Sequence, residues 1–265
     1  MLTRQTAVAG FFYPEDPTTL SDTVASFLEQ ARTSRAAFPA DSFPKAIIAP
    51  HAGYPYSGPI AATVYGLLQG ARARIRRVVL LGPAHRVYLR AMAFPSVDAF
   101  ASPLANVPLD KASIARALEL EYAQVSDEAH AEEHCLEVQL PFLQTVLDEF
   151  ALVPFVVGDC PPSAVAAVLE SLWGGEGTLI VVSSDLSHYL PYDQAQDTDR
   201  VTSQAIEARS SRLLGDEACG AHAINGLMLV AERYGLEVRT LDVRNSGDTA
   251  GDRSSVVGYG AYALS

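Results

Sequence analysis

The sequence predicts an α/β fold of three layers, in which helices cover both faces of a mostly parallel central sheet. Short, continuously apolar and β-branched runs recur along the chain, for example at 46–50, 78–82 and 179–182. Such runs are typical of parallel strands buried on both faces. Helical stretches separate these runs, and strands that alternate with helices build a three-layer α/β domain.

The N-terminal part of the chain predicts a helix followed by a βα unit. A helix over 17–33 begins where Asp16 supplies an N-cap and Pro17 a first-turn proline. The strand at 46–50 is followed by a second helix, which Pro59 is expected to open. Because βα crossovers are right-handed, the next strand should lie parallel to the first, with this helix on one face of the sheet.

The middle of the chain has a less regular pattern. The stretch 91–108 is proline-punctuated and predicts no regular element. Asp110 is then expected to cap a helix that continues to Leu120. A further helix is expected over 132–147, and Pro141 should kink or split it because proline lacks the backbone amide.

The remaining pattern continues the alternation. Strands are expected at 152–157, 179–182, 237–243 and 256–264, and helices at 162–173, 193–209 and 221–234. The proline-marked polar stretch from Thr33 to Pro44 is too short and too close to the N-terminus to separate domains. The 265 residues are therefore expected to form one domain over 1–265.

Composition excludes several classes of function. The formal net charge is -12, which repels phosphate backbones and anionic membranes, so neither nucleic acid nor a membrane is an expected partner. The three cysteines, Cys135, Cys160 and Cys219, are widely spaced and form no Cys-x-x-Cys pair. They predict reduced thiols rather than disulfides. The early charges at the N-terminus and the absence of a long apolar run predict a soluble, cytoplasmic protein.

Three histidines follow apolar strand-like runs, and this repeat is the main indication of function. His51 follows 46–50, His85 follows 78–83, and His188 follows the strand at 179–182 by a few residues. Ligands of open α/β sheets bind outside the carboxyl ends of the strands. Residues far apart in the sequence are therefore expected to meet in one cleft.

Imidazole is the commonest protein ligand of divalent transition metals, so His51 and His85 are the natural first pair of a metal site. A catalytic metal needs a third ligand, and spacing alone leaves this ligand open. The possible ligands are His134, Glu137, Cys160, Asp185, His188 and Cys219. Cys219 is slightly favoured, because it precedes a helix whose N-terminal dipole should stabilise a thiolate.

The loop that holds Asp185 and His188 also contains three serines. A carboxylate that bonds one imidazole nitrogen raises the basicity of the other, as a general base requires. We therefore expect His188 to move protons and Asp185 to orient it. A Ser-His-Asp hydrolase is the rival interpretation, but the sequence has no Gly-x-Ser-x-Gly elbow.

His134 and Glu137 are three residues apart on the helix expected over 132–147, so both can reach the cleft from one face. A helix-capping or packing network is the alternative role for these two residues. His130 and His222 are expected to face solvent.

The ordered motifs of the chain resemble those of the Memo family, whose bacterial and archaeal members are called AmmeMemoRadiSam system protein B. The motifs are Ala-Gly-Phe-Phe-Tyr-Pro (9–14), Pro-His-Ala-Gly-Tyr (50–54), Gly-Pro-Ala-His (82–85), Glu-His-x-Leu-Glu (133–137), Ser-Ser-Asp-Leu-Ser-His (183–188), Cys-Gly (219–220) and Val-Val-Gly-Tyr (256–259). They cover nearly the whole chain in one order and spacing. Cys135 and the Ser-Pro-Leu-Ala at 102–105 depart from the usual pattern, away from the expected ligands.

The resemblance implies a fold similar to the class III extradiol dioxygenases, which use non-haem iron(II) to open catechol-type rings. It also implies that His51, His85 and Cys219 hold the metal, most simply iron(II), with copper or zinc as alternatives, and that Asp185 and His188 lie beside it. Tyr54 and Ser184, which belong to these motifs, are expected to line the pocket with His134 and Glu137.

The resemblance favours a metal-dependent oxidoreductase with a small-molecule or peptide substrate. The alternative is a non-catalytic protein that holds a peptide or a metal such as copper in the same cleft, and a zinc hydrolase is the third choice. The genomic association of the family implies AMMECR1-like and radical SAM proteins as partners.

Overall fold

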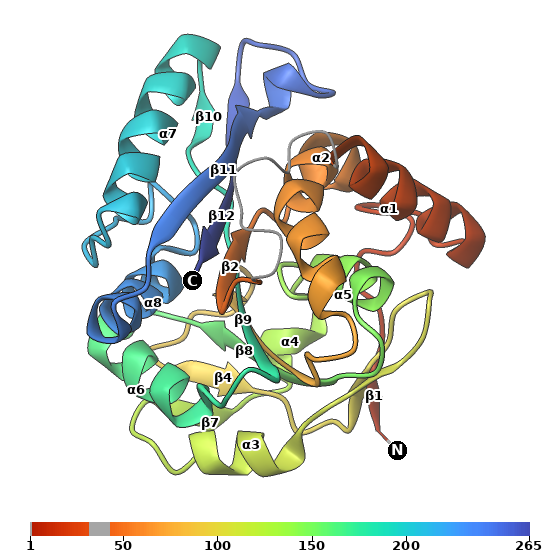
Figure 1. Cartoon of the computed structure of the whole chain (residues 1–265), viewed down its shortest axis with the longest axis vertical. Helices are drawn as coiled ribbons and strands as arrows, with labels where there is room; N and C mark the ends of the chain where they lie inside the picture. Colours follow the sequence, from red (N-terminus) through yellow and green to blue (C-terminus); the bar gives the residue numbers. More distant parts are fainter. Residues whose placement is uncertain (1, 32–42) are drawn as a thin grey trace.

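The computed structural model describes residues 2–31 and 43–265. Within these residues, one large sheet has nine strands. They are β2 (Ala46–Ala49), β3 (Arg77–Pro83), β4 (Met92–Phe94), β7 (Ala123–Val125), β8 (Ala151–Val157), β9 (Thr178–Ser183), β10 (His188–Leu190), β11 (Val238–Asn245) and β12 (Val256–Leu264). Their order is β10-β12-β2-β9-β3-β8-β4-β7, and β11 pairs with β12 (Figure 1).

The centre of this sheet is parallel. β2, β9, β3 and β8 pair in parallel, whereas β12 joins β2, and β4 joins β8, in the antiparallel sense. All residues of β2 and β9 are buried, as their continuous apolar runs predict. Ala49 at the end of β2 pairs with Ser183 at the end of β9, so the carboxyl ends of these two strands lie level.

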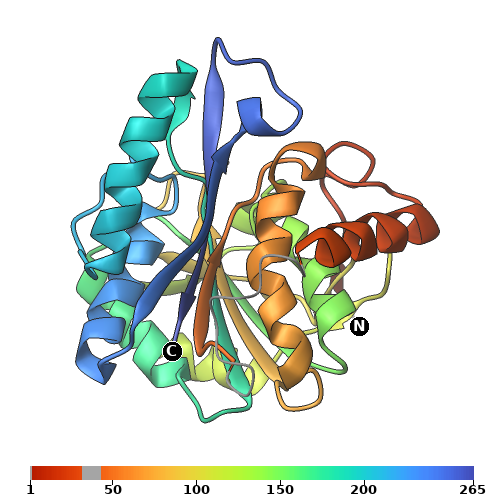
Figure 2. The ribbon, with the colours of Figure 1, turned by 45° about the horizontal axis from the view of Figure 1, so that its top comes forward.

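Helices cover both faces of the sheet. They are α1 (Pro17–Ala31), α2 (Tyr54–Tyr65), α3 (Lys111–Ala117), α4 (Glu128–Ala131), α5 (Leu140–Val146), α6 (Pro162–Leu172), α7 (Tyr192–Glu207) and α8 (Ala221–Tyr234), with the 3₁₀ turns η2 (Gly66–Ala71), η3 (Glu137–Gln139) and η4 (Ser246–Asp248). Figures 1 and 2 show α1, α2 and α5 on one side of the sheet and α6, α7 and α8 on the other. The predicted three-layer α/β fold is confirmed.

The predicted helix starts at Asp16 and Asp110 are confirmed. The Asp16 carboxylate accepts a hydrogen bond from the Thr19 amide (2.8 Å), and Asp110 accepts one from Ser113 (3.0 Å), the N-cap geometry that satisfies a free amide of the first turn. The end of the first helix, expected at residue 33, and most of the polar stretch 33–44 lie outside the described residues.

The stretch 91–108 is more regular than predicted. It contains β4 and two strands of a separate three-stranded sheet, β5 (Ala99–Phe100) and β6 (Val107–Pro108), which join β1 (Thr3–Arg4). These strands could not be predicted, because two or three residues are too few to display a periodicity.

Two prolines act differently from the prediction. Pro141 lies in the first turn of α5, where its missing amide costs nothing, so it opens a short helix instead of kinking a long one. The expected helix over 132–147 is replaced by a loop, η3 and α5, and α4 ends just before it. Pro59 lies inside α2, which starts five residues earlier at Tyr54, with Pro55 in its first turn.

Every helix among the described residues is too short or too polar to span a membrane.

Candidate functional site

The site lies where three neighbouring parallel strands end. β9 lies between β2 and β3 in the sheet. His51 follows β2 by two residues, His85 follows β3 by two residues, and Asp185 follows β9 by two residues. Because the carboxyl ends of parallel strands meet at one edge, these side chains converge there, as the strand pattern predicts.

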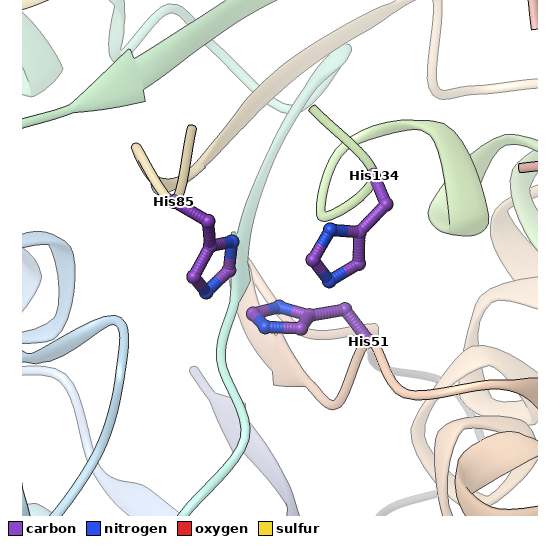
Figure 3. Close-up of side chains that lie close together, drawn as sticks. All are labelled: His51, His85 and His134. Atoms are coloured by element: carbon purple, nitrogen blue, oxygen red, sulfur yellow. The ribbon is translucent and has the colours of Figure 1, made fainter. Parts of the chain in front are cut away.

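His51, His85 and His134 form a histidine cluster. One ring nitrogen of each lies within 4.8 Å of the others. His134 comes from the loop between α4 and η3, not from a helix as expected. Figure 3 shows the three rings directed toward one another from three separate segments. The His85 and His134 rings stack at 4.8 Å, and the His51 ring stands nearly perpendicular to both.

Hydrogen bonds fix which nitrogen of His51 is free. The Ser183 hydroxyl donates its single proton to the Cys135 carbonyl (2.7 Å). It must therefore accept from His51 Nδ1, which lies 2.9 Å away. This leaves Nε2 of His51 with a lone pair, which the Cys219 sulfur approaches to 3.3 Å. The ring is only 2% exposed, so this lone pair faces other protein groups rather than bulk solvent.

Glu133 fixes His85 in the same way. One Glu133 oxygen accepts the His85 amide (2.7 Å), and the other lies 2.9 Å from His85 Nδ1. Burial would raise the pKa of Glu133, but the hydrogen bonds and charge of His85 and nearby backbone amides lower it to about 2. An ionised carboxylate only accepts, so Nδ1 of His85 donates and Nε2 is free.

His134 has a polar atom without a partner. Its Nδ1 lies 3.3 Å from a Glu133 oxygen, but it is not aligned for a hydrogen bond and has no other hydrogen-bond partner in the described part of the chain. Phe12 packs against the ring at 4.9 Å. Burial lowers the pKa of His134 to about 4, and burial lowers that of His51 to about 3. Both imidazoles are therefore neutral near pH 7, the form that binds metals.

Cys219 lies next to His51. Its sulfur is 3.3 Å from His51 Nε2 and accepts a hydrogen bond from the Asp185 amide (3.3 Å). The residue precedes α8, as predicted, but the helix dipole does not dominate its titration. Burial and the Asp185 charge raise the pKa of the Cys219 thiol to about 12. A thiolate at this position therefore needs an added positive charge nearby.

Asp185 and Ser184 support this part of the site. One Asp185 oxygen accepts the His51 amide (2.7 Å), and the other lies 3.9 Å from His51 Nε2. The expected orientation of His188 by Asp185 is not what the structure shows, because no hydrogen bond joins the two among the described residues and Asp185 bonds His51 instead. The Ser184 hydroxyl accepts the Gly220 amide (2.9 Å) and lies 3.9 Å from the Cys219 sulfur.

His188 lies on β10 and borders a cavity of about 550 Å³ together with His85 and Cys219. His188 and Leu190 both line this cavity, since residues two apart share one face of a strand. Tyr189 between them is 77% exposed and has a φ of 58°, an unusual backbone conformation for an aromatic residue. The pairing of β10 with β12 shifts its register at the same place.

Two residues expected in the lining lie elsewhere. Tyr54 is buried, and its hydroxyl donates to the Val138 carbonyl (2.8 Å), because α2 starts early enough to turn this ring into the core. Glu137 is fully buried and binds the N-terminal segment. It accepts from Arg4, from the amides of Ala7 and Val8, and from the Tyr13 hydroxyl. The packing network considered as its alternative role is therefore correct.

The comparisons with known proteins agree with this architecture. A family model described as Memo-like protein matches residues 4–263. The chain belongs to the Memo family. A MEMO1 family protein of Aquifex aeolicus is 35% identical, with 98% of each chain covered, and one of Thermotoga neapolitana is 32% identical, with 99% of each covered. The uncharacterized protein JW3007 of Escherichia coli K12 shares the fold (TM-score 0.52, 14% identity, 82% of this chain and 99% of that one covered).

Sequence reasoning missed the role of Glu133 in this Memo-family site. In the sequence, Glu133 is only the first residue of the Glu-His-x-Leu-Glu motif, and no local pattern connects it with His85. Its hydrogen bonds to His85 depend on a contact between residues 48 positions apart. His130 was also misjudged, since it is 2% exposed and its Nε2 bonds the Ala93 carbonyl (2.9 Å). His222 is exposed, as predicted.

A second close group, His85, Glu133 and Cys135, also has atoms within 4.8 Å of one another. Its donors are already used, because Glu133 bonds His85 and the buried Cys135 thiol donates to the Pro83 carbonyl (3.2 Å). This group therefore supports the histidine cluster and is not an independent metal site.

The histidine cluster fits a divalent transition metal. The hydrogen bonds of His51 and His85 are made through Nδ1, a ring nitrogen of His134 belongs to the same group, and the Cys219 thiol lies 3.3 Å from Nε2 of His51. Imidazole and thiolate together suit iron, copper and zinc. Bonds of about 2.1 Å to nitrogen and about 2.3 Å to sulfur, at angles near those of tetrahedral or octahedral sites, separate the two atoms by about 3.1–3.6 Å. The 3.3 Å between Cys219 and His51 lies in this range.

Proposed function

We propose that this Memo-family chain is a non-haem metal-dependent oxidoreductase, similar to a dioxygenase, that binds iron(II) at His51, His85 and Cys219. The observation that supports the proposal most directly is a pair of neighbouring imidazoles, each held through Nδ1 by a protein group, with a thiol 3.3 Å from Nε2 of His51. His134 is the competing third ligand, because its ring nitrogen belongs to the closer group. A bound iron(II) would supply a site for dioxygen and one-electron chemistry.

The protein residues around the metal would perform three tasks. Ser183 and Glu133 hold His51 and His85 in the tautomers whose Nε2 atoms face the site. Asp185 fixes the backbone at His51. His188 borders the open cavity, and its imidazole would take a proton from a substrate hydroxyl or return one to the product.

The metal content of variants tests the ligand set. Protein prepared without air should bind about one iron(II) per chain, and His51→Ala should lose most of it. Cys219→Ala and His134→Ala separate the two candidates for the third ligand, and Cys160→Ala is the matched control at a buried cysteine elsewhere. Full occupancy in Cys219→Ala, together with loss in His134→Ala, would replace the thiol by the imidazole in the proposal.

A second function uses the same donors without turnover. The thiol beside His51 is a soft ligand of the kind that selects copper(I), so the site could hold this metal, or a peptide bound against it. Binding of nitric oxide, a surrogate of dioxygen, distinguishes the two functions. An oxygen-activating iron(II) site needs open coordination positions, at which nitric oxide also binds. A new paramagnetic signal supports the oxidoreductase. The absence of this signal, and of oxygen consumption with catechols, hydroxylated aromatics and peptides, supports the binding function.

The proposed partners are an AMMECR1-like protein and a radical SAM protein. They follow from the resemblance of the motifs alone, and co-purification of tagged chains from one cell would test them.

A further inference from the structure

The residues that line the cavity beside the histidine cluster indicate which kind of ligand it binds. Its volume is about 550 Å³, within the range of small-molecule sites. Besides His85 and Cys219, its lining comes from β10, from the first turns of α7 and from the loop that precedes α8. A ligand in this cavity would therefore contact the proposed metal ligands directly.

Several polar groups of the lining are unused. The side chains of His188, Gln194, Thr198 and Asp216 make no hydrogen bond with another described residue. Gln194 and Thr198 are four residues apart on α7, so they lie on the same face of the helix. Such groups are free to bond a ligand, whereas those around His51 and His85 are already paired.

The charge of the lining has one sign. Asp216 and Glu217 contribute carboxylates, and the lining contains no Lys or Arg among the described residues. Glu217 is held in place because it accepts the Leu214 amide (2.7 Å), while Asp216 is exposed. The chain as a whole has a net charge of -12, which adds to the same field. The end of the cavity near Asp216 and Glu217 therefore attracts a cation and repels a phosphate or carboxylate, whereas a metal bound at His85 and Cys219 would attract an anion at the other end.

We propose that the ligand of this cavity carries a protonated amine next to Asp216 and Glu217, on a body that hydrogen-bonds His188, Gln194 and Thr198. The amine could belong to a small molecule or to a lysine side chain of a polypeptide, since both present the same ammonium group. The inference rests on the proposed function for its position beside the metal, whereas the preference for an ammonium group depends on Asp216 and Glu217 and is tested by removing one of these charges at constant metal content.

Three catechols of different charge test this preference by anaerobic calorimetry on the metal-loaded protein. Dopamine is cationic, 4-methylcatechol is neutral, and protocatechuate is anionic. Dopamine should bind about 3- to 10-fold more tightly than 4-methylcatechol, and protocatechuate should bind most weakly. The preference should weaken as salt rises, because the carboxylates are near the surface.

The variant Asp216→Asn removes one charge with little change of shape. This variant should bind dopamine about 3- to 10-fold more weakly, and its affinity for 4-methylcatechol should be unchanged. Asp22→Asn, at an exposed carboxylate on α1 away from the cavity, is the control and should change neither. Equal binding of dopamine and protocatechuate by the unmodified protein, or an unchanged dopamine affinity in Asp216→Asn, would overturn the inference.

Phenethylamine and phenylacetate separate this inference from the proposed function, because neither has the catechol diol. Tighter binding of phenethylamine, lost in Asp216→Asn, supports the amine site even if 4-methylcatechol fails to bind and the catechol chemistry is abandoned. If 4-methylcatechol binds but neither amine is preferred over its anion, the proposed function survives and the amine site is wrong. The peptide acetyl-Gly-Lys-Gly-amide tests whether the ammonium group belongs to a small molecule or to a polypeptide. Binding of this peptide tighter than that of phenethylamine indicates a polypeptide.

Discussion

The buried and the open sides of the site differ in how their polar side chains are hydrogen-bonded. On the buried side, Nδ1 of His51 and of His85 each bonds a protein group, Ser183 and Glu133 respectively. On the open side, His188 and the polar residues of α7 line a cavity without a protein partner among the described residues.

This difference indicates that the buried side binds the metal and the open side binds the substrate. A metal ligand must keep one geometry and one tautomer, and a network of hydrogen bonds supplies both. Residues that bind or protonate a substrate gain from free hydrogen-bonding capacity, which the ligand then uses. The predictions below test whether the two sides can be damaged separately.

The largest effect is expected on the open side. His188→Ala should keep most of its metal, because it is not among the converging imidazoles, while turnover of a substrate should fall by about 10²- to 10⁴-fold through loss of acid/base catalysis. Metal analysis and turnover on the same preparation measure the two effects. His222→Ala, at an exposed histidine on α8, is the control. Metal loss as severe as in His51→Ala would mean that His188 is a metal ligand, and the two sides of the site would then not have separate roles.

A smaller effect is expected when the buried network is weakened without removal of a ligand. Glu133→Gln replaces an ionised acceptor by an amide and loosens the His85 ring, so metal affinity should fall by about 10- to 100-fold. Titration with a competing chelator measures the affinity. Glu232→Gln, at an exposed carboxylate on α8, is the matched control and should hold its metal normally. An unchanged affinity in Glu133→Gln would show that His85 does not need this support.

The smallest effect concerns a buried histidine outside both sides of the site. Burial lowers the pKa of His130 to about 4, below the ordinary value of 6.5, so the unfolded chain binds more protons between these values. The contribution of His130 to stability is complete above pH 6.5 and is lost as the pH falls toward 4.

His130→Gln keeps a donor for the Ala93 carbonyl but does not titrate. Between pH 7 and pH 5.5, the free energy of unfolding of the unmodified chain should therefore fall by about 1 kcal/mol more than that of the variant. Urea unfolding at the two pH values measures the difference. Equal pH dependence of the two proteins would mean that His130 titrates normally in the folded state.

The strand pattern was sufficient to predict the centre of the fold. The apolar runs of β2, β3 and β9 became neighbouring parallel strands, and the residues that follow them met at one edge. The short strands of the stretch 91–108 could not be predicted, because their pairing depends on β1 and β8, which lie far away in the sequence.

The same limit applies to individual side chains. The helical spacing of His134 and Glu137 predicted a shared face. Residues 132–136 form a loop instead, so His134 lies in the histidine cluster while Glu137 accepts a hydrogen bond from Arg4. The helix start at Tyr54 likewise places that ring in the core. Local patterns cannot determine such directions, because a change of one or two residues in a helix boundary rotates every following side chain.

The sequence by itself determined the α/β class, the family and the convergence of His51 and His85, because buried parallel strands and their carboxyl ends follow from local hydrophobicity and chain direction. Only the tertiary structure decided which nitrogens are free, that Glu133 supports His85, and that Asp185 bonds His51 rather than His188. These contacts join residues between 48 and 134 positions apart. Such contacts depend on the packing of the whole chain, which no local pattern encodes.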